Sequence, residues 1–393
     1  MQLARKLWQL GRDALPVSGF HFERPLVLFQ SDDWGRVGLR DQAGLEQLRS
    51  AGIELGERPY DFYSLETGDD LSALMALLQR HHDSEGMPPC LQMNFVVANL
   101  DCVQTLSDSS AKLHFNLLAN GLPSGWERSN LIETYRTGID AGLFYPALHG
   151  SSHFCRPAVE RNLQHESNRS QLLRTLWQAG TPYIHWRMPW IGYEYWDPEQ
   201  LEDERFLPAE KQRELIGYSV GAFAKLLSKL PRSACAPGYR ANEDTHKGWA
   251  QHGIGVAQSG PGTLTPPHFD GNEMLHLSRN LEFEPALHPE LSVDVLVQQA
   301  ERCFERGIPV IVSTHSINFH STVRDFRSPT IQLLDQFLTA LESRHSDLLY
   351  LHDENLYDLI NHGRYRAQHK SVQVKVMRKN FTRSAMRQEQ MIG

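Results

Sequence analysis

The stretch PLVLFQSDDWG, from Pro25 to Gly35, decides how the rest of the sequence is interpreted. A nearly continuous apolar run of this kind is typical of a strand that is buried on both faces, as in a parallel sheet. The run ends in two adjacent carboxylates, Asp32 and Asp33, which are costly to desolvate, and Gly35 allows the chain to turn there. The pair indicates either a metal ligand beside a catalytic base, or an ordinary helix N-cap or Asx-turn.

Similar apolar runs alternate with amphipathic patterns along the chain, which predicts an α/β fold. The predicted strands cover residues 25–30, 91–98, 143–148, 233–236, 253–257, 281–286, 308–313 and 348–351. The predicted helices cover residues 71–80, 158–178, 208–230, 293–306 and 329–344. We expect a (β/α) barrel of seven or eight strands with long insertions at the carboxyl ends of the strands. An open, doubly wound sheet is the alternative, although no GxGxxG follows the first strand.

Length, charge and cysteine content argue against a membrane-spanning, a nucleic-acid-binding and a disulfide-rich protein. The 393 residues have a net charge of −8 and contain no apolar run of about 18 residues, so we expect no transmembrane helix and no nucleic-acid partner. The five cysteines are scattered and form no CxxC pair, which argues against a disulfide framework. Because no signal-peptide pattern precedes residue 25, we expect a cytoplasmic protein.

We expect one domain flanked by two short terminal segments. Residues 1–24 are predicted to form a helical segment, residues 25–360 the barrel, and residues 361–393 a basic tail of net charge +7. The simpler interpretation of the tail is a solvated terminus, and the alternative is peripheral contact with an anionic membrane surface or a lipid-linked substrate. No oligomeric state follows from the sequence.

The third predicted strand is followed by His149-Gly-Ser-Ser-His153. Two imidazoles four residues apart on a helical turn lie within reach of one cation, and neutral imidazole is the commonest nitrogen ligand of zinc. In a chain with 19 histidines such a pair also arises by chance. Together with Asp33, the pair would supply three ligands and leave a position open for water, as at a catalytic zinc site.

Two further strand ends carry polar residues. Residues 236–242 include Tyr239, whose backbone N–H could face an oxyanion, and Arg240, which could orient a carboxylate by a forked hydrogen bond. An ordinary Pro-Gly turn fits that segment equally well. His315 follows the apolar strand IPVIVS, which suits a general acid or a hydrogen-bonded core histidine.

Residues 181–210 form a long insertion rich in aromatic residues. Flat rings such as those of Trp186, Trp190 and Tyr193 suit the faces of a sugar, and the alternative is a lid packed on the barrel through its own aromatics. Trp34 lies beside the aspartate pair and, with Tyr239, is a further candidate substrate-binding residue.

Taken in order, these motifs resemble the polysaccharide deacetylase family, which is carbohydrate esterase family four with the NodB-homology domain. The resemblance covers roughly residues 25–355 and implies a distorted (β/α) barrel with a divalent metal, most simply Zn²⁺. It implies that Asp32 is the catalytic base, that Asp33, His149 and His153 bind the metal, and that His315 is the acid. Arg240 would orient Asp32.

The chain departs from the family pattern at several positions. Trp34 replaces a glycine, Gly150 replaces a serine or threonine, and Arg240 follows the Pro-Gly-Tyr turn instead of preceding it. The partner expected to tune His315 has no clear counterpart; its candidates are Glu282, Glu284 and Asp270.

The resemblance implies a hydrolase that removes an acyl group, most simply N-acetyl, from a sugar or glycan precursor. Two alternatives stay open at this point: a deformylase or small-molecule amidohydrolase of the same fold, and a barrel that retains a metal site without catalysis.

Overall fold

The computed structural model describes residues 16–108, 112–262, 264–367 and 370–382. A ten-stranded sheet forms its centre, with β2 (Leu26–Trp34) in the middle and every residue of that strand buried. The continuous apolar run before Asp32 therefore has the environment that the sequence predicts. All eight predicted strands overlap a strand of the structure, with ends that differ by a few residues.

The pairing around β2 is parallel and brings the carboxyl ends of several strands to one edge. β2 pairs with β12 (Val310–His315), β3 (Leu91–Phe95) and β13 (Leu349–Leu351), and β3 pairs with β6 (Phe144–Leu148). In the register of β12 and β2, His315 lies opposite Asp32. The residues that follow these strands therefore converge in space, although up to 283 positions separate them in sequence.

The sheet continues on the far side of β6 through β7, β8, β10 and β9. After β10, only Arg279 and Asn280 intervene before β11, which pairs with β12. These pairings confirm a mixed α/β fold built on a largely parallel sheet, while closure into a barrel stays a prediction. The remaining sheet strands are β7 (Ser233–Cys235), β8 (Val256–Ser259), β9 (His268–Phe269), β10 (Leu275–Ser278) and β11 (Leu281–Glu282).

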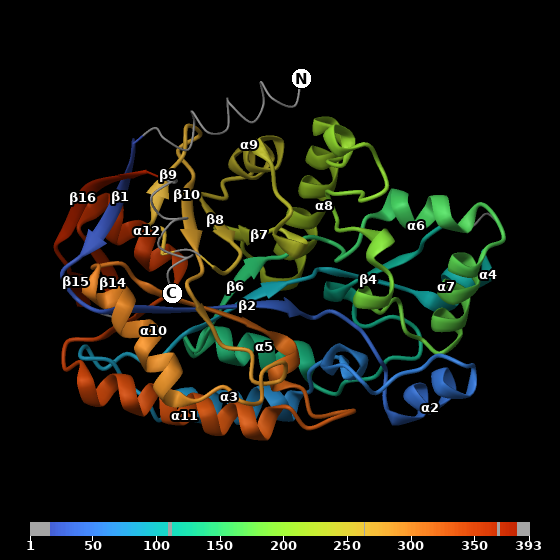
Figure 1. The fold of residues 1–393 in the computed structure, drawn as a ribbon, viewed down its shortest axis with the longest axis horizontal. Helices are drawn as coiled ribbons and strands as arrows, with labels where there is room; N and C mark the ends of the chain where they lie inside the picture. Colours follow the sequence, from blue (N-terminus) through green and yellow to red (C-terminus); the bar gives the residue numbers. More distant parts are fainter. Residues whose placement is uncertain (1–15, 109–111, 263, 368–369, 383–393) are drawn as a thin grey trace.

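Helices cover the sheet on both sides (Figure 1), with α3, α5, α10 and α11 grouped on one side of β2. Helix α10 shows why such segments form: Leu296, Val297, Ala300 and Cys303 are buried at steps of one, three and three residues, giving one apolar face. The predicted helix over 158–178 is interrupted and forms α6 and α7. The helices are α2 (Gln42–Ser50), α3 (Gly68–Leu78), α4 (Cys102–Ser107), α5 (Leu131–Asp140), α6 (Arg156–Leu163), α7 (Asn168–Gln178), α8 (Ala209–Leu227), α9 (Glu243–Gln251), α10 (Val293–Glu305), α11 (Arg327–Arg344) and α12 (Asp353–His362).

Both terminal segments contain strands that the sequence patterns did not predict. Residues 16–22, predicted to be helical, form strand β1 (Pro16–Phe22), which pairs antiparallel with β16 (Val376–Thr382) over seven residue pairs. Residues 376–382 are thus paired strand, although Arg378, Lys379 and Asn380 within them are exposed to solvent. The tail also contains β14 (Arg364–Ala367) and β15 (Lys370–Gln373), while residues 1–15 and 383–393 lie outside the described residues.

A small satellite sheet, β4 (Ala98–Leu100) with β5 (Phe115–Leu117), follows β3. The aromatic insertion of residues 181–210 contains three short 3₁₀ turns, at His185–Arg187, Pro189–Ile191 and Glu202–Glu204. Of the helices in the described part of the chain, none has both the length and the apolar character needed to cross a bilayer.

Candidate active site

The carboxyl edge of the parallel strands holds a cavity of about 310 Å³. Five predicted site residues line it: Asp32, Asp33, His149, His153 and His315. They come from β2, from the loop after β6 and from the end of β12. The sheet topology therefore assembles one site from three segments that are distant in sequence.

Asp33 is held in an unusual backbone conformation at the end of β2. Its φ angle is +75°, in the left-handed region that an aspartate tolerates better than most residues. Its Oδ1 lies 3.2 Å from Nε2 of His153 and 3.7 Å from Nε2 of His149, while Oδ2 pairs with the Arg36 guanidinium at 3.1 Å. The turn after the strand therefore directs one carboxylate oxygen toward both imidazoles.

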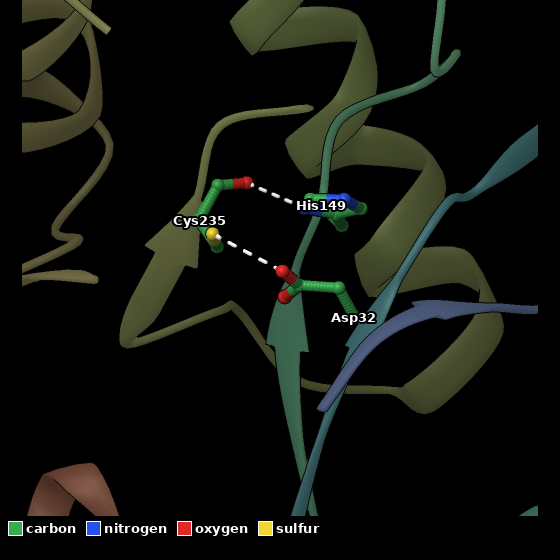
Figure 2. A group of neighbouring side chains, drawn as sticks. All are labelled: Asp32, His149 and Cys235. Atoms are coloured by element: carbon green, nitrogen blue, oxygen red, sulfur yellow. Dashed lines mark hydrogen bonds between the residues drawn. The ribbon is translucent and has the colours of Figure 1, made fainter. Parts of the chain in front are cut away.

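His149 is fixed by a backbone contact on the opposite side of its ring. Its Nδ1–H donates to the Cys235 carbonyl at 2.9 Å, and Figure 2 shows this bond beside the contact of the Cys235 thiol with Asp32. The bond selects the tautomer in which Nε2 carries a lone pair. That lone pair faces Asp33.

The three predicted ligands fit a divalent metal. Asp33 Oδ1 and His149 Nε2 are buried and have no hydrogen-bond partner among the described residues, and one ligand atom from each of Asp33, His149 and His153 lies within 4.8 Å of the others. Unpartnered buried polar atoms are costly, and a cation would satisfy both. Burial, with the Arg36 charge nearby, holds the pKa of His153 well below its usual range, so its imidazole is neutral as a ligand must be.

Gly150 accounts for one departure from the family pattern. Its φ angle is +77°, and a Cβ at this position would lie 2.0 Å from Oε2 of Glu194. The buried Glu194 accepts hydrogen bonds from the backbone N–H and hydroxyl of Ser151 and so holds the turn between the two histidines. Glycine is therefore required here by both conformation and space.

Asp32 is oriented by an arginine that the sequence did not reveal. The fully buried Arg279 donates through both terminal nitrogens to the two Asp32 oxygens, at 2.8 and 2.6 Å, and Asn94 donates to Asp32 Oδ1 at 2.6 Å. Burial alone would raise the pKa of Asp32, but the Arg279 charge outweighs it and holds that pKa well below its usual range. Asp32 is therefore ionised.

The prediction that Arg240 orients Asp32 is wrong. Arg240 is exposed, and its guanidinium carbon lies 4.7 Å from the centre of the Trp196 ring. Arg279 orients Asp32 instead of Arg240, because the two-residue step between β10 and β11 carries Arg279 into the interior of the sheet. The clue in the sequence was weak: a single arginine between two short apolar segments, LHLS and LEF.

His315 is paired with one of its three candidate partners. Its Nδ1–H donates to Oε1 of the buried Glu284 at 2.6 Å, whereas Glu282 is exposed and Asp270 lies 3.1 Å from His276. Burial disfavours the charged imidazole, but the Glu284 carboxylate outweighs that effect and raises the pKa of His315 to about 9. Its Nε2 lies 3.8 Å from Asp32 Oδ2, so an acid and a base face one cavity.

The predicted substrate-binding residues divide into two groups. Trp186, Tyr193 and Tyr239 line the cavity. Trp34 does not reach it, because its ring is fully buried and stacks on Phe319, and Trp190 packs into a separate core cluster. The packing alternative stated for the aromatic insertion therefore describes Trp190, and the predicted contact of Trp34 with substrate is wrong because its ring lies in the core.

The predicted role of the Tyr239 backbone N–H is wrong, although the side chain lines the cavity as predicted. Its backbone N–H donates to the Ala236 carbonyl at 2.8 Å, so it is not free to face an oxyanion. Its hydroxyl instead accepts from Arg279 at 3.0 Å. The side chain thus joins the wall of the cavity to the arginine that orients Asp32.

Arg36 is a further cavity residue that the sequence patterns did not indicate. It is buried, pairs with Asp33 and stacks over the Tyr63 ring at 3.8 Å. Only its position three residues after Asp33 could have pointed to it. Its charge balances the Asp33 carboxylate before any cation binds.

Comparison with known proteins gives structural similarities at low sequence identity. No protein-family model and no curated protein matches the sequence. Among solved structures, a candidate polysaccharide deacetylase from Mycobacterium smegmatis is similar at a TM-score of 0.46 and 11% identity, over 88% of this chain and 95% of that one.

Two further similar structures carry the name of carbohydrate esterase family 4. One is an esterase from Streptomyces lividans in complex with acetate, at a TM-score of 0.33 and 11% identity, over 83% of this chain and 91% of that one. The other is a pseudoenzyme from Bacillus anthracis, at 0.36 and 10%, over 84% and 64%. These names match the family that the motifs resemble, but the function proposed below depends on the residues of the cavity alone.

Proposed function

We propose that the chain is a metal-dependent hydrolase that removes an acyl group, most simply N-acetyl, from a sugar or glycan precursor. One observation carries the proposal: buried, unpartnered ligand atoms of Asp33 and His149, among the described residues, meet beside an ionised Asp32 and a His315 with a raised pKa. A binding protein has no need of an acid and a base beside a metal site. The combination therefore favours catalysis over the non-catalytic alternative.

Asp33, His149 and His153 would hold the metal. A divalent ion supplies Lewis acidity toward a carbonyl oxygen and lowers the pKa of water toward neutrality. Two imidazoles and one carboxylate form a donor set that suits Zn²⁺ and leaves a position open, so we propose zinc.

The other residues would manage protons. Asp32 is ionised and held by Arg279, so it can accept the proton of an attacking water. His315 carries a proton below about pH 9 and can give it to the leaving amine or alcohol. Glu284 fixes the His315 ring, which keeps Nε2 directed at the cavity.

Aromatic walls favour a sugar as the substrate. Trp186, Tyr193 and Tyr239 line the cavity with Tyr60 and Tyr183, and flat rings of this kind pack against the apolar faces of a pyranose. We propose that these residues select the substrate, whereas Asp32 and His315 carry out the chemistry.

Three finer proposals concern architecture and location. We propose that the strands close into a distorted barrel, supported by the two-residue step from β10, paired with β8, to β11, paired with β12. A cytoplasmic location, and contact of the basic segment with an anionic membrane or a lipid-linked substrate, are proposed from the sequence alone.

A panel of acylated substrates tests the proposal. Zinc-loaded protein should release acetate from an N- or O-acetylated oligosaccharide, measured by a coupled acetate assay, and the Asp33→Ala variant should lose both the zinc of this site and activity. Release of formate but not acetate would identify a deformylase, and cleavage of small amides alone an amidohydrolase. Bound metal with no release of any acyl group would contradict catalysis.

A further inference from the structure

A second group of metal-binding residue types lies away from the candidate active site. It comprises His246 on α9, Asp270 in the turn between β9 and β10, and His276 on β10, with one ligand atom from each within 4.8 Å of the others. None of the three lines the cavity that holds Asp33. Figure 1 shows α9 close to β10 at the end of the sheet where β8 and β9 also lie.

The Asp270 carboxylate is fixed in place by the backbone of its own turn. Its Oδ1 accepts hydrogen bonds from the N–H groups of Asn272 at 2.8 Å and Met274 at 3.0 Å. Its Oδ2 accepts from the side-chain amide of Asn272 at 3.3 Å and lies 3.1 Å from Nε2 of His276. A ligand that is held by hydrogen bonds of this kind loses little further freedom when it binds a cation.

The two imidazoles place further possible metal ligands beside this carboxylate. Nε2 of His276 is buried and has no hydrogen-bond partner in the described part of the chain, although Asp270 is close. The His246 ring lies 4.9 Å from the His276 ring at 73°, so the two rings approach edge to face. In the candidate active site, Asp33 Oδ1 and Nε2 of His149 show the same combination of close approach and missing hydrogen bonds within the described residues.

We propose that His246, Asp270 and His276 form a second site for a divalent metal of the Zn²⁺ type. Two nitrogens and one carboxylate oxygen suit such an ion, and the half-buried position lets water complete its coordination. The ion would join α9 to β10, two elements that are 24 or more residues apart in sequence. Such a site does not depend on the proposed hydrolase activity.

The position of the site gives it a consequence for the cavity. His276 lies three residues before Arg279, and the Arg279 guanidinium holds both oxygens of Asp32. Restraining β10 against α9 therefore restrains the strand that delivers Arg279 to the interior of the sheet. The second metal would support the geometry of Asp32 without touching it.

Metal stoichiometry in variants that lack the first site tests the proposal. The full-length Asp33→Ala protein is loaded with Zn²⁺, dialysed, and analysed for bound zinc by mass spectrometry. We expect about one equivalent to remain, and none in the Asp33→Ala/His246→Gln double variant. As a matched control, Asp33→Ala/His288→Ala removes an exposed histidine and should keep the equivalent.

Thermal denaturation gives a second readout. Chelation should lower the midpoint of Asp33→Ala, because a ligand bound only by the folded state stabilises it, and should leave the double variant unchanged. If Asp33→Ala does not fold, His153→Gln serves as the background. No retained zinc in either background, or equal zinc with and without His246, would overturn the proposal in favour of a metal-free His276–Asp270 ion pair. Neither result would affect the first site.

Discussion

At the scale of single residues, the forked contact of the buried Arg279 with Asp32 holds the proposed base from behind the cavity. A lysine would keep the positive charge at position 279 but could not bind both carboxylate oxygens at once. We therefore expect Arg279→Lys to lower kcat about 10- to 100-fold, the range typical of residues that orient a catalytic group. Steady-state kinetics on the acylated substrate, at equal zinc content, measures the effect.

Arg240 provides the control for that prediction. Because its side chain is exposed and packs on Trp196, Arg240→Ala should leave kcat nearly unchanged. A large loss of kcat in Arg240→Ala, with none in Arg279→Lys, would restore the assignment that the sequence suggested.

Glu284 sets the pH range in which His315 can act as an acid. The acid form is present below the pKa of about 9 and is lost as the pH rises through that value, so the rate should fall on the alkaline side. Glu284→Gln removes the carboxylate that raises the pKa of His315. The alkaline limb should then move to lower pH by about one unit or more, as measured by the pH dependence of kcat/KM. An unmoved limb would mean that another group is the acid.

At the scale of elements, the turn from β6 to α6 holds both proposed imidazole ligands, His149 and His153. A methyl group at Gly150 meets Glu194 and also forces a left-handed conformation on alanine. We expect Gly150→Ala to lower the free energy of unfolding by more than the ~1–2 kcal/mol that the conformation alone costs. It should also weaken zinc binding, because His149 and His153 flank the turn.

Gly142 offers a matched comparison just before β6. Its φ angle is +72°, and a Cβ there would meet nothing within 4 Å among the described residues. Gly142→Ala should therefore show only the conformational cost in chemical denaturation. Equal losses in the two variants would mean that Glu194 moves away at little cost and that the contact does not define the turn.

The sequence predicts the elements better than it predicts their contacts. The buried strands could be predicted because a continuous apolar run bounded by turn residues is typical of a strand covered on both faces. The grouping of Asp33, His149 and His153 could be predicted because these residues follow such strands directly. Arg279 and β10 were missed because the four residues of β10, LHLS, alternate between buried and half-buried positions and form no continuous apolar run. Strand β1 was missed because its pairing partner, β16, lies more than 350 residues away.

Trp34 shows a different limit of the sequence. Its position beside the aspartate pair suggested contact with substrate, yet β2 turns its ring into the core, where its N–H donates to the Ser31 hydroxyl. Whether Trp34 contacts substrate or packs in the core depends only on the direction of its side chain at the end of β2. That direction depends on the left-handed conformation of Asp33, which residue type alone does not specify.

At the scale of the whole molecule, one largely parallel sheet brings the proposed base, acid and metal ligands together with the arginine that orients the base, from four distant segments. Asp32 and Asp33 come from β2, the imidazole ligands from the loop after β6, His315 from β12, and Arg279 from the step between β10 and β11. Metal binding and proton transfer are thus assigned to adjacent residues. The separate roles of the two aspartates can be tested because their contacts differ. Asp32 contacts Arg279 and Asn94, whereas Asp33 contacts the imidazoles, so each can be changed without removing the contacts of the other.

The Asp32→Asn variant tests this central claim most directly. Acetate release is measured at equal, directly determined zinc content for the wild-type protein and the variant. We predict that Asp32→Asn binds zinc as the wild type does but releases acetate at least ~100-fold more slowly, the lower end of the range for a lost general base. An Asp32→Asn protein with full zinc and a near-normal rate would contradict the division of roles between the two aspartates.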